Sequence, residues 1–272
     1  MNRYCGFNPL RYGDLFINLA ACRILKRLDP NSHLTFVVNG NYRSAAPLFL
    51  DQPDIDKVHV THKALDGFDE IDWKWTKEQQ FNHVFNPMQD HHDQWWLYRS
   101  QSLECAHMHG LPIEGDTGKL SLNRWFEPTK GLARYVALQA FAGSYDPSNT
   151  KQLSPARAQE IVDLIRARGY EVLQLGLPTE PKLEGTTRID TDFFGAIKNM
   201  LGCKILVTTD SGFSWGASCY DHPTVGLYSH AYYGKDRISA IQPLNPNAIY
   251  LDDDNLNRIE LNTVEKALST LL

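Results

Sequence analysis

The segment KILVTTDSGFSWGAS, residues 204–218, gives the clearest signal of the fold. An apolar run of strand length ends in Thr-Thr-Asp-Ser-Gly, and small and aromatic residues follow, which predicts a strand, a turn and a helix. Asp210 or Ser211 can serve as the helix cap. Gly212 would also let an anionic group come close to the helix N-terminus. The spacing of this stretch favours the plain cap, so the choice depends on the rest of the chain.

The second half of the chain repeats this alternation of strands and helices. Ser154 supplies a cap with Pro155 at the first helical position, and Gly169 closes the helix that they begin. A last amphipathic helix is expected to be capped near Asn262. The strands are predicted at 135–140, 170–175, 204–208 and 224–228, and further helices at 191–200 and after Gly212.

The first half follows the same pattern less regularly. A strand at 4–7, a helix at 17–28 that ends at Asp29-Pro30, and a strand at 34–38 form the unit of a parallel sheet. Weaker strands are predicted at 58–60 and 81–85, and a helix at 93–109. An irregular stretch, 123–134, separates the two halves. We therefore expect an α/β protein with two Rossmann-like doubly wound parallel-sheet domains that face a cleft, over residues 1–128 and 129–272.

Composition and charge narrow the class of protein. The chain has 272 residues, of which 42% are hydrophobic, and the formal net charge is −5. Neither half is basic, so an extended nucleic-acid surface is not expected. A phosphate-bearing small molecule needs only a local positive site and stays open. The five scattered cysteines predict reduced thiols. No membrane-length apolar run or signal peptide is visible, so we expect no integral membrane segment and a cytoplasmic location.

In an open parallel sheet, ligands bind beyond the carboxyl ends of the strands. Two predicted loops there contain a glycine before or at a helix start, Gly13-Asp14 and Asp210-Ser211-Gly212. Lys151 follows another strand and could reach a diphosphate at the neighbouring helix N-terminus. Glu180 ends the next strand, where a carboxylate could accept hydrogen bonds from ribose hydroxyls. From spacing alone the favoured alternatives are plain N-caps at Asp14 and Asp210, a surface lysine and a solvated glutamate.

Two other polar clusters have simpler interpretations. The segment Asp90–Trp96, DHHDQWW, contains adjacent histidines, but adjacent histidines seldom bind one ion together and no third cluster at metal-site spacing is visible. A helix start with aromatic anchors is the favoured interpretation, and no metal or cofactor is expected. The run Asp252–Asp254 is predicted to be a solvated turn.

Taken in order, four segments resemble the heptosyltransferase-like glycosyltransferases, family 9 of the two-Rossmann-domain (GT-B) enzymes. Near the N-terminus the family has Gly-Asp followed by a helix, and this chain has YGDLFINLAACRILKRLDPNSHLTFVV at 12–38. Its second domain has a lysine loop, a strand end with Glu, and an Asp-Ser/Thr-Gly loop before a Pro-led strand. The matching segments here are TKQLSP at 150–155, GLPTE at 176–180 and DSGFSWGASCYDHPTVGLY at 210–228. The similarity is strongest over about 150–228 and poor over about 61–125.

The resemblance implies an inverting enzyme that takes a nucleotide-diphospho-sugar donor in its second domain and a glycan or glycolipid acceptor in its first. It implies a part in lipopolysaccharide or other surface-glycan synthesis, and so allows a place at the inner membrane face. By this resemblance Asp14 is the general base, and Gly13 before it is a substrate-binding residue. Lys151, Ser211 and Gly212 contact the diphosphate, Asp210 shapes their loop, and Glu180 contacts the ribose.

The chain departs from the family pattern at three positions. Trp215 stands where the family usually has His, Leu153 where it has an aromatic residue, and Ala20 where the first helix has proline. These departures keep other functions open. One alternative is a non-catalytic nucleotide-sugar-binding protein, and another is a glycosyltransferase or sugar-nucleotide epimerase that acts on a different substrate.

Overall fold

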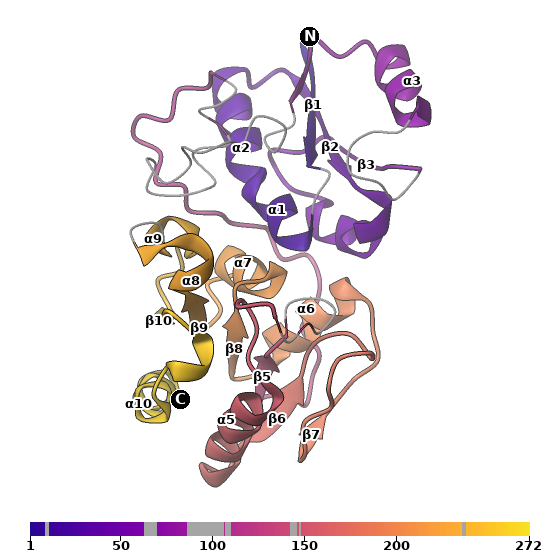
Figure 1. Cartoon of the computed structure of the whole chain (residues 1–272). Coiled ribbons are helices and arrows are strands. Elements are labelled where there is room, and N and C mark those ends of the chain that lie inside the picture. The colour runs from indigo at the N-terminus through magenta and orange to yellow at the C-terminus, as the bar shows by residue number, and fades with distance from the viewer. Residues whose placement is uncertain are drawn as a thin grey trace. The chain divides into compact units, whose positions relative to one another are not determined.

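The computed structural model describes residues 1–8, 11–62, 70–85, 106, 110–141, 146, 148–235 and 238–272. It divides into two compact units, Met1–Trp125 and Phe126–Leu272, each built on its own parallel sheet (Figure 1). The segment Asp90–Trp96 lies outside the described residues, as does the helix predicted over 93–109 apart from residue 106.

The first unit contains a four-stranded parallel sheet in the order β3-β2-β1-β4. The strands are β1 (Arg3–Asn8), β2 (His33–Val38), β3 (Lys57–Val60) and β4 (His83–Phe85). The helices are α1 (Tyr12–Ile17), α2 (Leu19–Leu28), the 3₁₀ segment η1 (Gly40–Phe49) and α3 (Glu70–Glu78). The single helix expected at 17–28 is thus the second of two, divided at the buried Asn18, and η1 and α3 were not predicted.

Aromatic packing joins the helices of this unit to its sheet. The ring centroid of Phe49 in η1 lies 4.6 Å from that of Phe36 in β2 and 5.6 Å from that of Phe16 in α1. All three side chains are fully buried. Since aromatic pairs at such distances bury large areas, they fix η1 and α1 against the strands.

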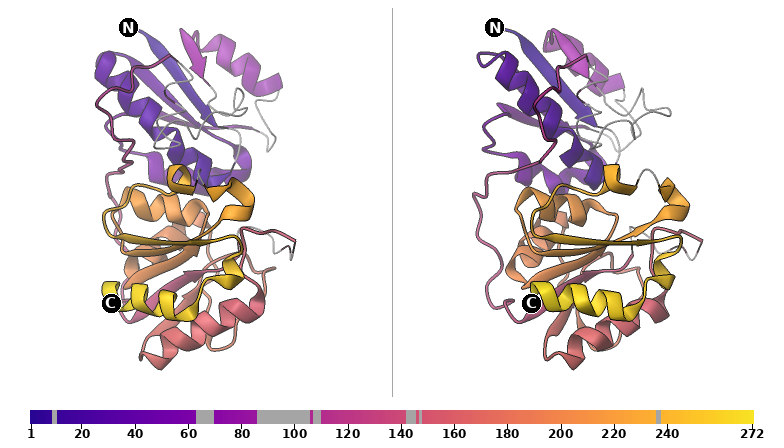
Figure 2. Two further views of the ribbon diagram at one scale, coloured as in Figure 1. Left: turned by 60° about the vertical axis from the view of Figure 1, so that its left-hand side comes forward. Right: turned by 90° about the vertical axis from the view of Figure 1, so that its left-hand side faces the viewer.

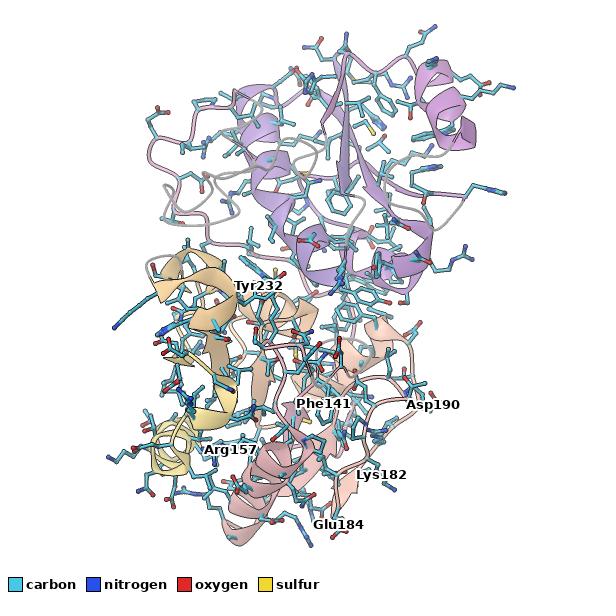
Figure 3. All side chains as sticks on the ribbon, viewed as in Figure 1. Phe141, Arg157, Lys182, Glu184, Asp190 and Tyr232 are labelled. Atoms are coloured by element: carbon cyan, nitrogen blue, oxygen red, sulfur yellow. The ribbon has the colours of Figure 1, made fainter. Side chains whose placement is uncertain are left out.

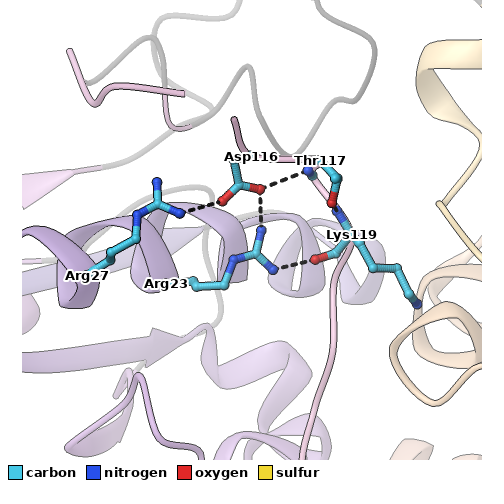
Figure 4. A network of polar contacts seen from close by, with 6 residues as sticks. Arg23, Arg27, Asp116, Thr117 and Lys119 are labelled. Carbon is cyan, nitrogen blue, oxygen red and sulfur yellow. Dashed lines mark hydrogen bonds and ion pairs between the residues drawn. The ribbon is translucent and has the colours of Figure 1, made fainter. Parts of the chain in front are cut away.

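An ion-pair network joins residues 116–119 to α2 (Figure 4). Asp116 pairs with Arg23 at 2.6 Å and with Arg27 at 3.2 Å, both on α2. The Gly118 N–H donates to Asp116 at 2.9 Å, and Arg23 also donates to the Lys119 carbonyl. Burial alone would raise the pKa of Asp116, but these donors and charges outweigh it and hold that pKa below its usual value. The carboxylate therefore clamps residues 116–119 onto α2.

The second unit contains a six-stranded parallel sheet in the order β10-β9-β8-β5-β6-β7. The strands are β5 (Tyr135–Gln139), β6 (Glu171–Gln174), β7 (Thr186–Thr187), β8 (Ile205–Thr209), β9 (Thr224–Ser229) and β10 (Ala248–Asp253). The helical segments are α5 (Pro155–Ala167), α6 (Phe193–Gly202), α7 (Gly212–Cys219), α8 (His230–Tyr233), α9 (Ile238–Ile241), η4 (Leu256–Arg258) and α10 (Leu261–Leu271). If β5 is counted as strand 1, this order is 6-5-4-1-2-3, which is the strand order of a doubly wound Rossmann fold.

Helices cover both faces of this sheet. Two views show α5 and α10 side by side on one face (Figure 2). Their apolar side chains pack with alternate residues of the central strands in one buried cluster, and the members from β5 and β8 are Val136, Leu138, Ile205 and Val207. The other face is covered by α7, where Ser214 shares a hydrogen bond of 2.7 Å with the buried Tyr228 hydroxyl of β9. Such continuous apolar strands are typical of a parallel sheet buried on both faces.

The predicted helix signals hold for α5 and fail for α10. The Ser154 side chain accepts from the Arg157 N–H, Pro155 is the first helical residue, and Gly169 has a φ of +83° just beyond the helix. In α10 the helix begins at Leu261 without a side-chain cap, so the cap predicted at Asn262 is wrong.

The turn predicted at Asp252–Asp254 is wrong for its first two residues, because Asp252 and Asp253 end the strand β10. β10 lies at the edge of the sheet, pairs only with β9 among the described strands, and is half-buried over most of its length. Edge strands of this kind tolerate charged residues, and these residues make the strand difficult to recognise from its sequence pattern.

Candidate functional site

The strand order of the second unit creates a switch point between β5 and β8. From β5 the chain runs to β6 and β7 on one side, and it then returns to build β8, β9 and β10 on the other. The segments that leave the carboxyl ends of β5 and β8 therefore diverge, and the crevice between such segments is where open α/β sheets bind ligands. Lys151 follows β5, and Asp210, Ser211 and Gly212 follow β8.

The structure brings Lys151 and Asp210 together at this point. The Lys151 Nζ lies 2.9 Å from the Asp210 Oδ2, and both side chains are largely buried, with exposed fractions of 21% and 15%. The Lys151 N–H donates to Asn149 at 3.0 Å and the Leu153 N–H to the Ala140 carbonyl at 3.1 Å, so the backbone on both sides of the lysine is fixed. The simpler interpretation, a solvated surface lysine, is wrong.

Ser211, rather than Asp210, is the N-cap of α7. Its hydroxyl accepts from the Phe213 N–H at 3.3 Å, and its carbonyl accepts from the Ser214 N–H at 3.1 Å. Gly212 is the first helical residue. The plain cap expected at Asp210 is therefore wrong, since the Asp210 side chain pairs with Lys151 instead. Together these residues place an ammonium group near a helix N-terminus, a combination that suits a phosphate group.

A buried polar network lies beneath the two loops. Gln139, at the end of β5, accepts from the Thr208 hydroxyl at 2.7 Å and from the Thr209 hydroxyl at 3.4 Å. Its amide nitrogen donates to the Phe141 carbonyl, on the loop that leads toward Lys151. The Thr208 hydroxyl also contacts the Ser211 hydroxyl at 3.1 Å. Gln139 therefore joins the loop after β5 to the loop after β8.

Glu180 is buried rather than solvated, so the simpler interpretation of this residue is wrong as well. It is 3% exposed, and within the described residues neither carboxylate oxygen has a hydrogen-bond partner of normal geometry. Burial raises its pKa to about 8, while the Leu177 backbone and the positive charge of Arg188 oppose this rise. Arg188 donates to the Glu180 and Pro181 carbonyls at 3.1 and 2.7 Å and so braces the turn.

Gly13 and Asp14 lie in the first unit, inside α1, which follows β1. Asp14 is the third residue of that helix, and its carboxylate accepts from the Arg11 N–H at 2.9 Å. Arg11 is the N-cap, so the expectation that Asp14 itself is a plain N-cap is wrong. β1 lies between β2 and β4 in its sheet, so Asp14 again follows a strand at a switch point.

Two residues that contribute to this arrangement, Tyr232 and Gln139, were not predicted from the sequence. The ring centroid of Tyr232 in α8 lies 4.0 Å from the Lys151 Nζ, and Gln139 donates to the Phe141 carbonyl on the loop toward Lys151. Figure 3 labels Tyr232 in the second unit. Gln139 could have been identified from the sequence, because it is a polar residue at the end of the apolar strand 135–139. No spacing connects Tyr232 with Lys151, because they follow different strands.

Two further findings concern metal binding and membrane-spanning helices. Across the described ranges, no group of three or more His, Cys, Asp or Glu side chains could hold a metal ion. In the same parts of the chain, no helix has the length and apolar character that crossing a bilayer requires.

No protein-family model and no curated protein sequence matches this chain. Solved structures match over nearly its full length. A family 9 glycosyltransferase from Veillonella parvula has a TM-score of 0.73 at 17% identity and covers 99% of this chain and 96% of its own. The E. coli ADP-heptose LPS heptosyltransferase II has 0.64 at 14%, covering 100% and 98%. E. coli heptosyltransferase WaaC with ADP-2-deoxy-2-fluoro heptose has 0.63 at 12%, covering 99% of each.

At these identities the likeness concerns the fold. Two parallel α/β sheets, of four and six strands, and the family 9 and heptosyltransferase neighbours fit a GT-B type fold. The resemblance inferred from the sequence motifs is therefore confirmed as a structural resemblance to these glycosyltransferases.

Proposed function

We propose that this chain is an inverting glycosyltransferase that moves a sugar from a nucleotide-diphospho-sugar to a hydroxyl of a glycan or glycolipid, in lipopolysaccharide or other surface-glycan synthesis. In this proposal residues 1–128 form the acceptor side, residues 129–272 bind the donor, and the two domains face a cleft. The observation that carries the proposal is the Lys151–Asp210 pair beside the N-terminus of α7, at the switch point of the second sheet. The fold likeness to glycosyltransferases supports it.

The donor's diphosphate would be bound by Lys151 and by the backbone at Ser211 and Gly212, with Asp210 holding the lysine in place. As the bond from the sugar to the diphosphate breaks, negative charge grows on the leaving oxygen. An ammonium group and oriented N–H dipoles stabilise that charge where it develops. Glu180 would accept hydrogen bonds from the ribose hydroxyls, and these would give its buried carboxyl group the partners that it lacks among the described residues.

The acceptor chemistry is assigned to Asp14, which follows Gly13 in α1. The acceptor oxygen attacks the anomeric carbon, the bond to the diphosphate breaks with its electron pair, and the nucleoside diphosphate leaves. Asp14 takes the proton of the attacking hydroxyl. A carboxylate with an ordinary pKa of about 3.9 is a weak base. It can serve here because the hydroxyl becomes acidic as it bonds to the electron-poor carbon, so the position of the carboxylate matters most.

A thermal-shift panel tests the donor site. ADP, GDP, UDP, CDP and dTDP are added to the wild type and to Lys151→Ala. A ligand that binds only the folded state stabilises it by about 2.7 kcal/mol at a hundredfold excess over Kd. We expect one diphosphate to raise the Tm of the wild type and to have a much smaller effect on the variant. No shift with any of the five would contradict the proposal.

A second experiment tests the base. Asp14→Asn keeps a side-chain oxygen for the Arg11 N–H but cannot take a proton at neutral pH. We expect sugar transfer to fall by about a hundredfold or more, while nucleoside diphosphate affinity stays as in the wild type. Undiminished transfer in this variant would remove Asp14 from the mechanism.

A non-catalytic nucleotide-sugar-binding protein is the second candidate, and one observation favours it. Trp215, where the related family usually has a histidine, is only 4% exposed in α7, as expected of a packing residue. In this alternative the chain binds the same donor without transferring the sugar. Turnover of any nucleotide sugar, including slow hydrolysis, would exclude it.

A further inference from the structure

Three segments, each of which follows a different strand, meet at the ammonium group of Lys151. Lys151 itself follows β5, Asp210 follows β8 and lies 2.9 Å away, and Tyr232 belongs to α8, directly after β9. The Lys151 Nζ lies 4.0 Å from the centroid of the Tyr232 ring, well within the range of a cation–π contact. One charged group is thus flanked by a carboxylate and by an aromatic ring.

Tyr232 is exposed, yet its helix is firmly attached. The side chain is 58% exposed, although it lies beside an ion pair that is largely buried. The start of α8 is joined to the end of β10 by a 2.7 Å contact from the His230 Nε2 to Asp252. The Ala231 N–H and the Ser229 hydroxyl both donate to the Asp254 carbonyl, at 3.3 and 3.1 Å. These contacts hold the backbone that carries the ring.

We infer that Tyr232 is a positioning residue of the donor site, which holds the Lys151 ammonium group where it meets the diphosphate of the ligand. This inference rests on the proposed function. A lysine has a flexible four-carbon stem, so an unsupported ammonium group loses rotamer freedom when it binds an anion. A ring that already restricts the ammonium group removes part of that loss, and preorganised groups bind more tightly for this reason.

An aromatic ring at position 232 also suits a lysine whose ammonium group exchanges the Asp210 carboxylate for a diphosphate. A diphosphate that contacts Lys151 competes with the Asp210 carboxylate for the same ammonium group. A second carboxylate in place of Tyr232 would repel the incoming anion, whereas an uncharged ring attracts the cation without this repulsion. Tyr232 can therefore keep its contact with Lys151 in both the empty and the bound protein.

The test measures Kd by calorimetry for whichever of ADP, GDP, UDP, CDP and dTDP binds the wild type. Because Tyr232 is exposed, its variants are expected to fold normally. A cation–π contact at a partly exposed site accounts for a change of about two- to fivefold in affinity, so Tyr232→Leu should raise Kd by that factor. Tyr232→Phe keeps the ring and should restore wild-type affinity. Tyr170→Leu is the control, because this partly buried tyrosine lies just before the amino end of β6, at the other end of the strands from Lys151, and it should not change Kd.

A double-mutant cycle separates positioning from a general structural effect. In a Lys151→Ala background, Tyr232→Leu should have no further effect on Kd, because the group that the ring positions is gone. An equal loss in both backgrounds, or an unchanged Kd in Tyr232→Leu, would overturn the role of Tyr232 while leaving the nucleotide site in place. Failure of all five diphosphates to bind the wild type would instead contradict the proposed function itself.

Discussion

The carboxylate of Glu180 occupies the space where any residue other than glycine at position 176 would have its Cβ. An ideal Cβ built on Gly176 would lie 1.9 Å from the Glu180 Oε2, and Gly176 has a φ of +139°, in the region that favours glycine. The turn after β6 thus depends on the absence of a side chain at 176. In the GLPTE segment, the buried position of Glu180 therefore requires a glycine at position 176.

Gly176→Ala should therefore strain the backbone and displace Glu180. We expect a loss of about 2–4 kcal/mol in the free energy of unfolding, together with weaker nucleoside diphosphate binding. Gly169→Ala is the control, because Gly169 has a φ of +83° but open space around its Cβ position. It should cost only about 1 kcal/mol and leave Kd unchanged. Urea unfolding and calorimetry measure both, and equal effects would contradict a specific role for Gly176.

Glu180 should make stability depend on pH in a recognisable direction. Its folded-state pKa of about 8 exceeds the ordinary value of 4.5, so the folded protein retains a proton that the unfolded chain releases. The stability that Glu180 contributes is therefore fully present below pH 4.5 and is lost as pH rises toward about 8, by at most about 1.4 kcal/mol per pH unit. Glu180→Gln should flatten this decline in a Tm profile from pH 5 to 8. The exposed neighbour Glu184 gives the control, since Glu184→Gln should keep the wild-type slope.

Gln139→Leu should weaken the support beneath both loops of the site. The change leaves the buried Thr208 and Thr209 hydroxyls and the Phe141 carbonyl without the amide group that joins them. We expect a loss of about 1–3 kcal/mol in the free energy of unfolding, measured in urea. Thr208→Val removes the shortest hydroxyl contact with Gln139, so the double variant should lose less than the sum of the two single changes. Strict additivity would mean that the network is not a unit.

Asp116→Asn should release the clamp on α2. We expect a loss of about 1–3 kcal/mol at pH 7, because Arg23 loses a charged partner for its guanidinium group. The folded-state pKa of Asp116 is below the ordinary 3.8, so its contribution is present above that value and is lost as pH falls through the lower, folded-state pKa. The difference between variant and wild type should accordingly shrink by pH 3. Glu114→Gln, at an exposed neighbour, should match the wild type at both pH values.

The long apolar strands and well-capped helices of the second unit could be predicted because local sequence determines them. The run 204–208 and the Ser154-Pro155 start of α5 are examples, and both agree with the structure to within a residue. β10 could not be predicted, since an edge strand that ends in Asp252 and Asp253 has the composition of a turn. β7 is only two residues long and carries no periodicity.

The candidate site was predictable in its residues but not in its contacts. The motifs identified Lys151, Asp210 and Glu180, yet spacing favoured a surface lysine, a helix cap and a solvated glutamate. Their real environments come from pairing between strands that are far apart in sequence. A pattern along the chain cannot show that Asp210 faces Lys151, or that the turn after β6 buries the Glu180 carboxylate.

The central place of β5 has a consequence for how the second unit folds. Gln139 and Thr208, which contact each other across the middle of the sheet, are 69 positions apart, and Lys151 and Asp210 are 59 apart. Contacts between such distant positions form slowly, because a long loop must close before they contribute. A partly folded chain in which β8 has not docked on β5 thus has a lysine without its carboxylate. Any opening that releases β8 separates the residues of the candidate site all at once. If the proposed donor binds there, it should slow proteolysis of the entire segment between these strands.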